Sequence, residues 1–177
     1  MKYTIRKGSP EDIKGIMEVE RTSFHADIIE KEAVFLERLK VYTEGFFILT
    51  EDDRIIGYAC TEIWKKKDTV EGYDFLLGHS ISKVHDLTGT ELYIASMGIL
   101  PEVRGKGLGE FLFQSMMGQS KEALPHLEGA ILIVAESWKK ARRIYGAEGF
   151  NEVGVLKDFF AIEGQSKEAA IIMTKTL

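Results

Sequence analysis

The sequence predicts a single α/β domain built on one mixed β-sheet, and three observations support this prediction. The chain has 177 residues, which is the length of one ordinary domain with a proper core. Hydrophobic residues make up 45% of it and charged residues 29%, a composition typical of globular proteins. Strand-like and helix-like segments follow the order β-α-α-β-β-β-α-β-α-β-β, and no linker divides residues 1–177 into two domains.

The amino-terminal segment predicts a short strand and two helices. Residues 3–6 alternate weakly between polar and apolar and predict the first strand. Ser9-Pro10-Glu11-Asp12 is a good helix start, with serine at the N-cap, proline at N1 and an acidic residue at N3. An apolar stripe follows this start and ends near Phe24. A second helix fits residues 28–43, because Glu44-Gly45 stops the pattern there.

A β-hairpin comes next, followed by a long irregular segment. Residues 46–50 and 54–64 are strand-like and flank the acidic turn Glu51-Asp52-Asp53. Residues 65–89 have no regular pattern, and a connection of this length inside a compact domain is usually functional or mobile. We therefore expect residues 65–89 to form a lid over a substrate site.

The carboxy-terminal half predicts three strands and two helices, after a strand that leads into a glycine-rich loop. That strand covers residues 91–100, and residues 108–124 have the apolar spacing of a helix that packs on a sheet. Residues 130–135 are almost continuously apolar, which predicts a central strand covered on both faces. Ser137 is placed to cap a last helix that ends at Gly149. Two strands close the domain and cover residues 150–156 and 169–174.

Charge and cysteine content argue against several classes of protein. The formal net charge of −5 argues against non-specific binding to nucleic acid. The single cysteine, Cys60, is too few for an internal disulfide or a thiol-based metal site, and its apolar surroundings predict a plain buried thiol. No apolar run approaches the roughly 18 residues of a membrane span, and no signal peptide is found. We expect a cytoplasmic enzyme or binding protein, monomeric or homodimeric, that binds neither nucleic acid nor membrane and holds no metal.

The most informative stretch is the loop Arg104-Gly105-Lys106-Gly107-Leu108-Gly109, which follows a strand and opens a helix. Glycines let backbone N–H groups crowd around a phosphate, and a helix N-terminus adds about half a positive charge. The spacing G-x-G-x-G differs from the G-x-G-x-x-G of a dinucleotide fold, and no Walker A string G-x-x-x-x-G-K-[ST] occurs. The loop therefore predicts a site for a charged, phosphate-bearing ligand.

This loop resembles the acetyl-CoA pyrophosphate loop of the GNAT N-acetyltransferases, whose core pattern is Arg or Gln followed by x-x-G-x-G or x-x-G-x-A. Arg104, Gly107 and Gly109 match that pattern. Residues 141–150 resemble the family's A-x-x-x-Y-x-x-x-G-F segment, and together the two motifs extend the resemblance to nearly the whole chain. A fainter similarity points to the arylalkylamine N-acetyltransferase branch. The resemblance implies a three-layer fold with a central mixed, mostly antiparallel seven-stranded sheet flanked by about four helices.

The resemblance also implies which residues hold acetyl-CoA. In the family the pantetheine arm pairs with the strand before the loop like an added strand, and the loop amides bind the pyrophosphate. Gly98 suits that strand, because a strand glycine permits a bulge or a close backbone approach. Trp138 stands where the family often has a cofactor-contacting asparagine, and its indole either packs against the arm or is an ordinary core or surface aromatic. The residues carried over as cofactor-binding are Met97, Gly98, Ile99, Arg104, Gly105, Lys106, Gly107, Leu108, Gly109, Trp138 and Ala141.

Acetyl transfer to an amine requires a base for the amine and benefits from a proton for the departing thiolate. The resemblance assigns the general-acid role to Tyr145, because the family uses the matching tyrosine in this way. The base stays open between Glu62 and Glu91, with Glu20, His85 and an ordered water chain as further candidates. Direct attack of the amine in a ternary complex is the mechanism that we expect.

The acceptor amine stays open at the level of sequence. The acidic balance suits a cationic amine, and a small amine, a polyamine and a peptide N-terminus all satisfy it. Arylalkylamine enzymes carry a histidine pair at the positions of Tyr93 and Ala95, so their proton relay is missing here. Two alternatives share the glycine loop: a catalytically inactive CoA-binding sensor or regulatory module, and a nucleotide-binding protein that takes ATP or NAD without CoA.

Overall fold

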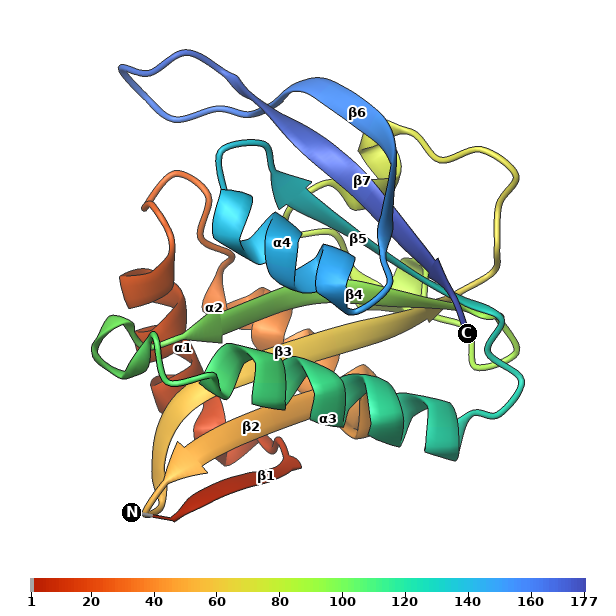
Figure 1. Cartoon of the computed structure of the whole chain (residues 1–177). Coiled ribbons are helices and arrows are strands. Elements are labelled where there is room, and N and C mark those ends of the chain that lie inside the picture. Colours follow the sequence, from red (N-terminus) through yellow and green to blue (C-terminus); the bar gives the residue numbers. More distant parts are fainter. Residues whose placement is uncertain (1) are drawn as a thin grey trace.

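Seven strands form one sheet in the computed structural model, which describes residues 2–177 (Figure 1). Their order across the sheet is β1-β2-β3-β4-β5-β7-β6. Only β4 and β5 run parallel, and every other neighbouring pair is antiparallel. The strands are β1 (Tyr3–Lys7), β2 (Phe46–Glu51), β3 (Arg54–Trp64), β4 (Glu91–Ile99), β5 (Gly129–Ala135), β6 (Asn151–Phe160) and β7 (Glu168–Thr176). The predicted mixed, mostly antiparallel sheet is confirmed.

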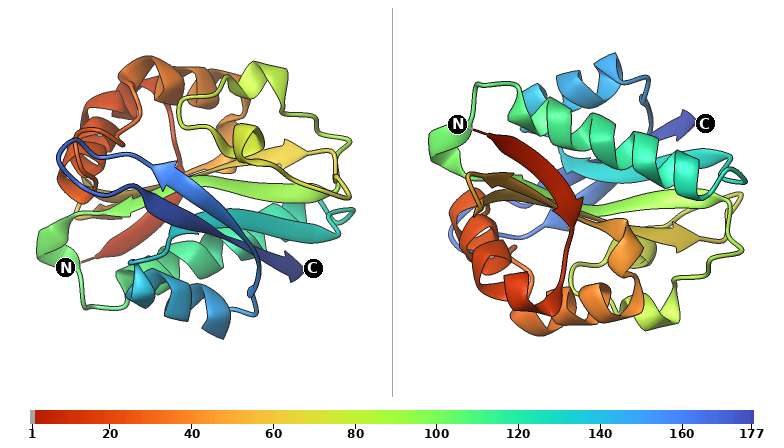
Figure 2. Two further views of the ribbon diagram at one scale, coloured as in Figure 1. Left: turned by 90° about the horizontal axis from the view of Figure 1, so that it is seen from above. Right: turned by 90° about the horizontal axis from the view of Figure 1, so that it is seen from below.

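Helices cover both faces of this sheet, which gives the predicted three layers (Figure 2). One face carries α1 and α2, and the other carries α3 and α4. The helices are α1 (Ile13–Ser23), α2 (Glu32–Val41), α3 (Leu108–Ala123) and α4 (Lys139–Ala147). Within residues 2–177 no helix is long and apolar enough to cross a membrane.

The first helix starts after Ser9 as predicted, although its first turn is a 3₁₀ turn and the α-helix begins after it. Pro10–Asp12 form a single 3₁₀ turn, and α1 continues from Ile13. The backbone N–H of Ser9 donates to Asp12 Oδ2 at 2.8 Å, which satisfies one of the free donors at a helix start.

The second helix is shorter than residues 28–43, because the chain makes a turn before it. The N–H groups of Ile28 and Ile29 both donate to the carbonyl of His25, at 2.9 and 3.2 Å. α2 therefore begins at Glu32, and a 3₁₀ turn at Thr43–Gly45 follows its end. This turn between α1 and α2 brings Ile28 and Glu30 toward the sheet, where they line a cavity described below.

A β-bulge interrupts the pairing of β3 with β4 at Ala95, where Cys60 pairs with Ser96 but Thr61 pairs with Ile94. Of the two alternatives that we allowed for Gly98, a bulge or a close approach, the bulge is therefore excluded. Gly98 instead permits a close approach of α1, because a Cβ there would lie 3.0 Å from Val19 Cγ1. α1 thus packs tightly on the strand that leads to the glycine loop.

The sheet has two halves, β1–β4 and β5–β7, which are joined by a short pairing of β4 with β5. β4 and β5 pair only through Glu91–Tyr93 and Gly129–Ile131, and the two strands then diverge (Figure 1). From Ile94 to Ile99, the edge of β4 that faces β5 has no strand partner among the described residues. Its backbone N–H and C=O groups on that edge are thus available to a ligand.

The interior agrees with two further predictions. Six of the seven residues of β5 are fully buried, as expected of a central strand with helices over one face and apolar side chains on the other. The thiol of Cys60 is buried near Arg38, and burial raises its pKa to about 12. Cys60 is therefore an inert buried thiol at physiological pH.

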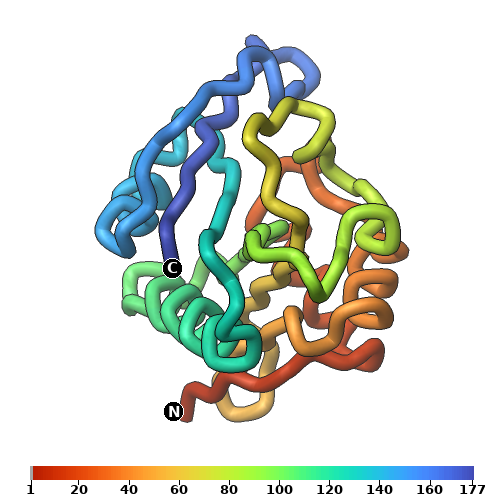
Figure 3. Tube along the Cα trace, turned by 90° about the vertical axis from the view of Figure 1, so that its right-hand side faces the viewer, coloured from red at the N-terminus to blue at the C-terminus, as the bar shows by residue number. Residues whose placement is uncertain are grey.

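Residues 65–89 carry two 3₁₀ turns, Gly72–Phe75 and Ile81–Lys83, and no helix or strand of greater length. Figure 3 shows this segment, coloured yellow to lime, on the face turned toward the viewer and beside α2, coloured orange. Phe75 and Ile81 are buried, so the segment is packed onto the domain at both turns.

Candidate active site between strands β4 and β5

The glycine loop adopts the backbone conformation that its glycines permit. Gly105 and Gly107 have φ values of +82° and +76°, which L-residues rarely adopt. A Cβ added at either position would meet nothing within 4 Å, so these glycines are required for backbone conformation and not for packing. Gly107 is the N-cap of α3, and the free N–H groups of the first turn of α3 follow it directly. The backbone at this end of α3 thus has the form of the predicted anion cradle, and the name cradle is kept for it below.

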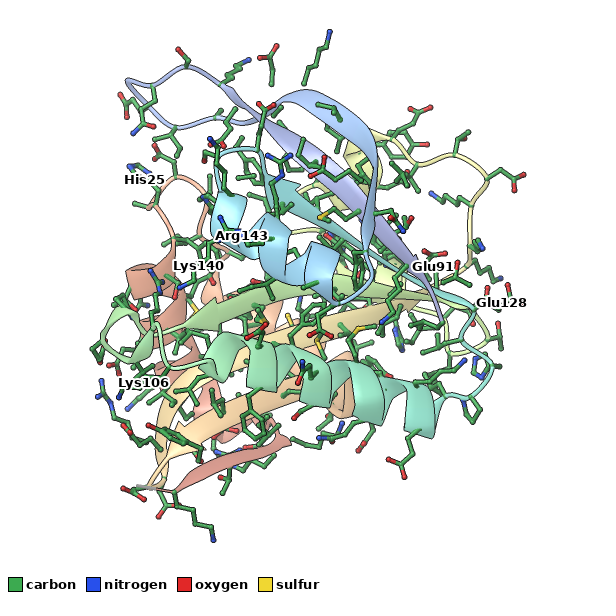
Figure 4. The ribbon with its side chains drawn as sticks, in the orientation of Figure 1. His25, Glu91, Lys106, Glu128, Lys140 and Arg143 are labelled. Atoms are coloured by element: carbon green, nitrogen blue, oxygen red, sulfur yellow. The ribbon has the colours of Figure 1, made fainter. Side chains whose placement is uncertain are left out.

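Two cationic side chains flank the cradle. Arg104 is exposed, and its Nε donates to the carbonyl of Ile99 at 3.1 Å. This bond holds the guanidinium beside the loop, and its terminal nitrogens have no hydrogen-bond partner among residues 2–177. Lys106 projects from the same loop (Figure 4). A diphosphate group suits these charges together with the N–H groups of the helix start.

The free edge of β4 presents the backbone groups of Met97 and Ile99. The N–H of Leu100 donates to Ile56 of β3, and alternate residues of an antiparallel pair face opposite edges. Ile99 and Met97 therefore face away from β3, as predicted for a strand that binds an extended ligand arm. The carbonyl of Ile99 already accepts from Arg104 Nε and Ser23 Oγ, so its N–H is the group that it offers.

The divergence of β4 and β5 opens into a cavity of about 90 Å³. β4 and β5 contribute opposite walls, and the ends of α1 and β6 contribute apolar side chains. Its lining consists of Glu20, Phe24, Ile28, Glu30, Leu77, Tyr93, Ile94, Ala95, Ser96, Met97, Leu132, Ile133, Val134, Trp138, Tyr145 and Phe160. A larger cavity of about 310 Å³ at Trp64 shares no residue with the loop or with this lining. We therefore place the site between β4 and β5, and name its cavity the divergence cavity.

Tyr145 lies on α4 and lines the divergence cavity from one face of the sheet. Its ring packs against Phe113 and Phe150, with centroids 5.1 and 6.4 Å away. Burial raises the pKa of its phenol to about 12, so the hydroxyl keeps its proton at any physiological pH. Ala141, one turn earlier, packs against the core and does not line the cavity.

Trp138 stands at the mouth of the divergence cavity. Its indole stacks on Phe24 at 5.6 Å and on Phe160 at 6.4 Å, and the residue is 38% exposed. Trp138 is also the N-cap of α4, so the expected cap at Ser137 is wrong. The N–H of Ser137 donates instead to Glu168 Oε1 at 2.6 Å, which ties it to β7.

Glu20 is the buried carboxylate of the divergence cavity. It is 1% exposed and accepts the N–H of Glu30 at 2.9 Å and the hydroxyl of Tyr58. The hydroxyl of Tyr58 also lies 2.7 Å from Ser96 Oγ, on the cavity wall. Burial raises the pKa of Glu20 above its ordinary value, against the opposing effect of these two hydrogen bonds.

The other base candidates lie elsewhere. Glu62 is fully buried, does not line the cavity, and accepts Trp64 Nε1 at 2.8 Å and His79 Nε2 at 2.7 Å. Glu91 lies at the opposite end of the domain from Lys106, near Glu128 (Figure 4). His85 lines the larger cavity.

The burial of Glu20 is indicated by the spacing of residues along the first helix. Ile13, Ile16, Met17 and Glu20 follow the i, i+3, i+4, i+7 spacing of one helix face, so Glu20 continues the stripe that packs on the sheet. A carboxylate at a core position of an amphipathic helix indicates a functional site when it has no cationic partner.

Known protein sequences and structures resemble this chain. A sequence model of the acetyltransferase (GNAT) family matches residues 13–150. The N-alpha-acetyltransferase of Sulfurisphaera tokodaii is 28% identical over 160 residues, which are 90% of this chain and 86% of that protein. The N-alpha-acetyltransferase of Saccharolobus solfataricus is 26% identical over 176 residues, 99% of this chain and 93% of that protein. GphF, a GNAT-like decarboxylase in complex with isobutyryl-CoA, shares the fold with a TM-score of 0.82 at 16% identity over 98% of each chain.

Proposed function

Since this chain belongs to the acetyltransferase (GNAT) family, an enzyme family that uses acetyl-CoA, we propose that it acetylates the α-amine at the N-terminus of a peptide or protein. The observation that carries the proposal is the pairing of Glu20 and Tyr145 across one cavity. α1 brings Glu20 from one face of the sheet and α4 brings Tyr145 from the other, and the divergence of β4 and β5 lets both reach the same space.

The residues present fit acetyl-CoA. Gly105, Gly107 and the first turn of α3 leave room for a diphosphate, and Arg104 and Lys106 supply positive charge beside it. The free edge of β4 at Met97 and Ile99 suits the amide groups of a pantetheine arm. When bound, acetyl-CoA supplies an acetyl group activated as a thioester.

Glu20 takes the role of general base in this proposal. An acceptor ammonium that enters the cavity gives its proton to the Glu20 carboxylate, directly or through the hydroxyls of Ser96 and Tyr58. The freed amine nitrogen then forms the new C–N bond with the acetyl carbon. A backbone N–H on the free edge of β4 stabilises the negative charge that develops on the carbonyl oxygen.

Tyr145 completes the proton balance as the general acid. As the C–S bond breaks, its phenol gives a proton to the departing thiolate sulfur, and the second proton of the newly acetylated nitrogen returns to the phenolate as the amide forms. Its raised pKa keeps the proton available over the whole physiological range. The proton that Glu20 has gained leaves to solvent before the next turnover.

Three considerations favour an α-amine over a lysine or a polyamine. An α-ammonium has a pKa of about 8, against about 10.4 for lysine, so a carboxylate removes its proton more readily. The relatives from Sulfurisphaera tokodaii and Saccharolobus solfataricus carry the name N-alpha-acetyltransferase and match at least 90% of this chain. The apolar mouth at Phe24, Trp138 and Phe160 also suits the first residues of an extended peptide.

The decisive variant is Glu20→Gln, which keeps the shape of the side chain and removes its basicity. We expect kcat/KM for a peptide acceptor to fall about 100-fold or more, in the range of a general base. In the wild type, protonation of Glu20 lowers kcat/KM on the acidic side, at a pH above the ordinary carboxyl range because the pKa is raised. Glu20→Gln loses this acidic limb. Thiol release measured across pH 5–9 reports both effects.

Glu18→Gln is the matched control, because Glu18 lies on the same helix but is exposed and pairs with Arg54 at 3.2 Å. It keeps the wild-type rate and pH profile. A wild-type rate in Glu20→Gln, with circular dichroism showing an unchanged fold, contradicts the role of Glu20. Acetylation of spermidine or lysine but of no peptide N-terminus contradicts the proposed acceptor.

A further inference from the structure

Leu77, in the segment between β3 and β4, forms part of the wall of the divergence cavity. Leu77 lines the cavity on the side of Ile28 and Phe24, although it is 46% exposed. Gly78 has a φ of +74°, and this left-handed turn places its neighbours against the sheet. Residues 76–80 carry Leu77 and are held by two specific contacts, made by the two residues that follow it, Gly78 and His79.

The first contact is made by the backbone of Gly78. Its N–H donates to Glu30 Oε2 at 2.7 Å. Glu30 is itself held by Arg38, whose two terminal nitrogens donate to its two oxygens at 2.8 Å each. Because Arg38 and Glu30 are both buried, this ion pair is a rigid anchor for the turn.

The second contact is made by the side chain of His79. Its Nε2 lies 2.7 Å from Glu62 Oε1, and its Nδ1 lies 2.9 Å from the carbonyl of Leu76. A carbonyl only accepts hydrogen bonds, so Nδ1 carries a proton, and Nε2 faces a carboxylate. The imidazolium satisfies both contacts at once, and the Glu62 hydrogen bond raises the pKa of His79 against the opposing effect of burial.

Side chains from β3, β4 and α2 surround the imidazole of His79. From β3, Trp64 has its ring 6.3 Å away, and from β4 the ring of Tyr93 lies at 6.0 Å. Arg38 of α2 lies beyond Glu62, 3.8 Å from Glu62 Oε1, and its charge opposes protonation of His79. Glu62 is thus the group that favours the charged imidazole, and it is fully buried.

We propose that residues 76–80 are a fixed acceptor wall on which Leu77 selects peptides with an apolar first side chain, and that His79 is a positioning residue that holds Leu77 in place. The inference rests on the proposed function. Beside Leu77, Ile28 and Phe24, an apolar side chain is removed from water favourably, whereas a polar one loses hydration without gaining a partner. Selection of this kind in an apolar pocket is typically about 10- to 200-fold.

The test uses two peptides that differ only in the first residue, leucine or serine, and measures kcat/KM for each. We expect the wild-type enzyme to prefer the leucine peptide about 10-fold or more, and Leu77→Ser to reduce that ratio severalfold while the KM for acetyl-CoA stays the same. Leu87→Ser is the matched control, because Leu87 is 54% exposed on the same segment and does not line the cavity. It keeps the wild-type ratio.

The pH dependence of that ratio tests His79. Titration of the catalytic groups acts on both peptides alike and cancels in the ratio, and each kcat/KM is divided by the unprotonated fraction of that peptide's own amine. As the pH rises through the raised pKa of His79, the imidazole loses its charge and the wall loosens, so the wild-type ratio falls. His79→Gln retains a neutral hydrogen-bond donor, and its ratio does not change with pH.

The outcomes separate the two proposals. If the wild type acetylates both peptides but Leu77→Ser keeps the wild-type ratio, the wall does not select the acceptor and the inference fails alone. If the ratio in His79→Gln follows the same pH curve as in the wild type, His79 does not position Leu77. If neither peptide releases thiol with the wild-type enzyme, the proposed function fails and the inference falls with it.

Discussion

The buried glutamates Glu20, Glu30 and Glu62 differ in their partners, and the difference separates structural from chemical roles. Glu30 is held by the guanidinium of Arg38, and Glu62 is held by His79 and Trp64. Glu20 receives hydrogen bonds only from neutral donors, a tyrosine hydroxyl and a backbone N–H. A buried carboxylate with a cationic partner stabilises a fixed geometry, whereas one without such a partner is poised to accept a proton.

The role of Tyr145 is tested by Tyr145→Phe, which removes the hydroxyl and keeps the ring contacts with Phe113 and Phe150. We expect kcat to fall about 100-fold, with the affinity for CoA unchanged. Because the pKa of Tyr145 is about 12, the fall is uniform between pH 6 and 9. Steady-state kinetics and calorimetry with CoA measure the two quantities.

Tyr73→Phe is the control for this variant, because Tyr73 is 65% exposed and lies on the segment between β3 and β4. It leaves kcat unchanged. A wild-type kcat in Tyr145→Phe contradicts the general-acid role, and a weaker affinity for CoA assigns the hydroxyl to binding instead.

At the level of single residues, the sequence pattern pointed to the proposed cofactor groups more clearly than to the proposed base. Arg104, Gly105 and Gly107 were identifiable because a phosphate loop is local, and its chemistry depends on neighbours in the chain. The base depends on contacts between α1, β3 and β4, which are distant in sequence. Glu62 was as plausible as Glu20 until the fold placed His79 on it.

At the level of elements, α3 has a glycine at its N-cap that the backbone conformation requires, and another glycine in its interior that the backbone conformation does not require. Gly107 caps the helix with a φ of +76°, whereas Gly118 is exposed in the helix interior and has no neighbour within 4 Å of an added Cβ. Gly107→Ala forces an L-residue into the left-handed region, and we expect a loss of about 1–2 kcal/mol. Gly118→Ala is expected to gain about 0.5–1 kcal/mol.

Urea denaturation of both variants measures these changes in the free energy of unfolding. Gly118→Ala serves as the matched control, because it makes the same chemical change in the same helix. Equal stabilities for the two variants contradict a requirement for glycine at the cap.

The exact ends of the helices and the position of the bulge depend on contacts that the spacing of apolar residues does not reveal. Strand and helix types were predictable because apolar residues recur with the period of each element. The expected helix over residues 28–43 was too long at its start, since the turn at His25 takes its first N–H groups. The bulge at Ala95 depends on the pairing of β4 with β3, and no residue type at Ala95 indicates it in the sequence.

At the level of the whole molecule, the ligand is expected to join two halves of the sheet. CoA at about 100 times its dissociation constant stabilises a protein by about 2.7 kcal/mol if it binds only the folded state. Arg104→Ala removes a charge-assisted phosphate contact, and we expect CoA binding to weaken by about 1–3 kcal/mol. Thermal unfolding with and without CoA measures the difference.

The control is Arg54→Ala, because Arg54 is exposed and pairs with Glu18 and Glu102 away from the cradle. It shows the same stabilisation by CoA as the wild type. Equal stabilisation of Arg104→Ala by CoA contradicts a phosphate contact for Arg104.

The overall architecture was predictable because the order of elements restricts the topology and the two motifs fix the place of the loop. The course of residues 65–89 was not predictable, because this segment is held by single contacts to buried carboxylates. Gly78 and His79 reach Glu30 and Glu62, which are 48 and 17 residues away in sequence. Whether the segment moves as a lid stays a prediction.

The short junction of β4 with β5 also has a consequence for the order of folding. β1–β4 and β5–β7 each form mainly from neighbouring antiparallel strands, whereas the three parallel pairs between Glu91–Tyr93 and Gly129–Ile131 need the crossover through α3. Contacts that close a long loop form slowly. The two halves therefore dock late, and their docking completes the space between Glu20 and Tyr145. The return of acetyl transfer during refolding accordingly reports the docking step, after the strands of each half have formed.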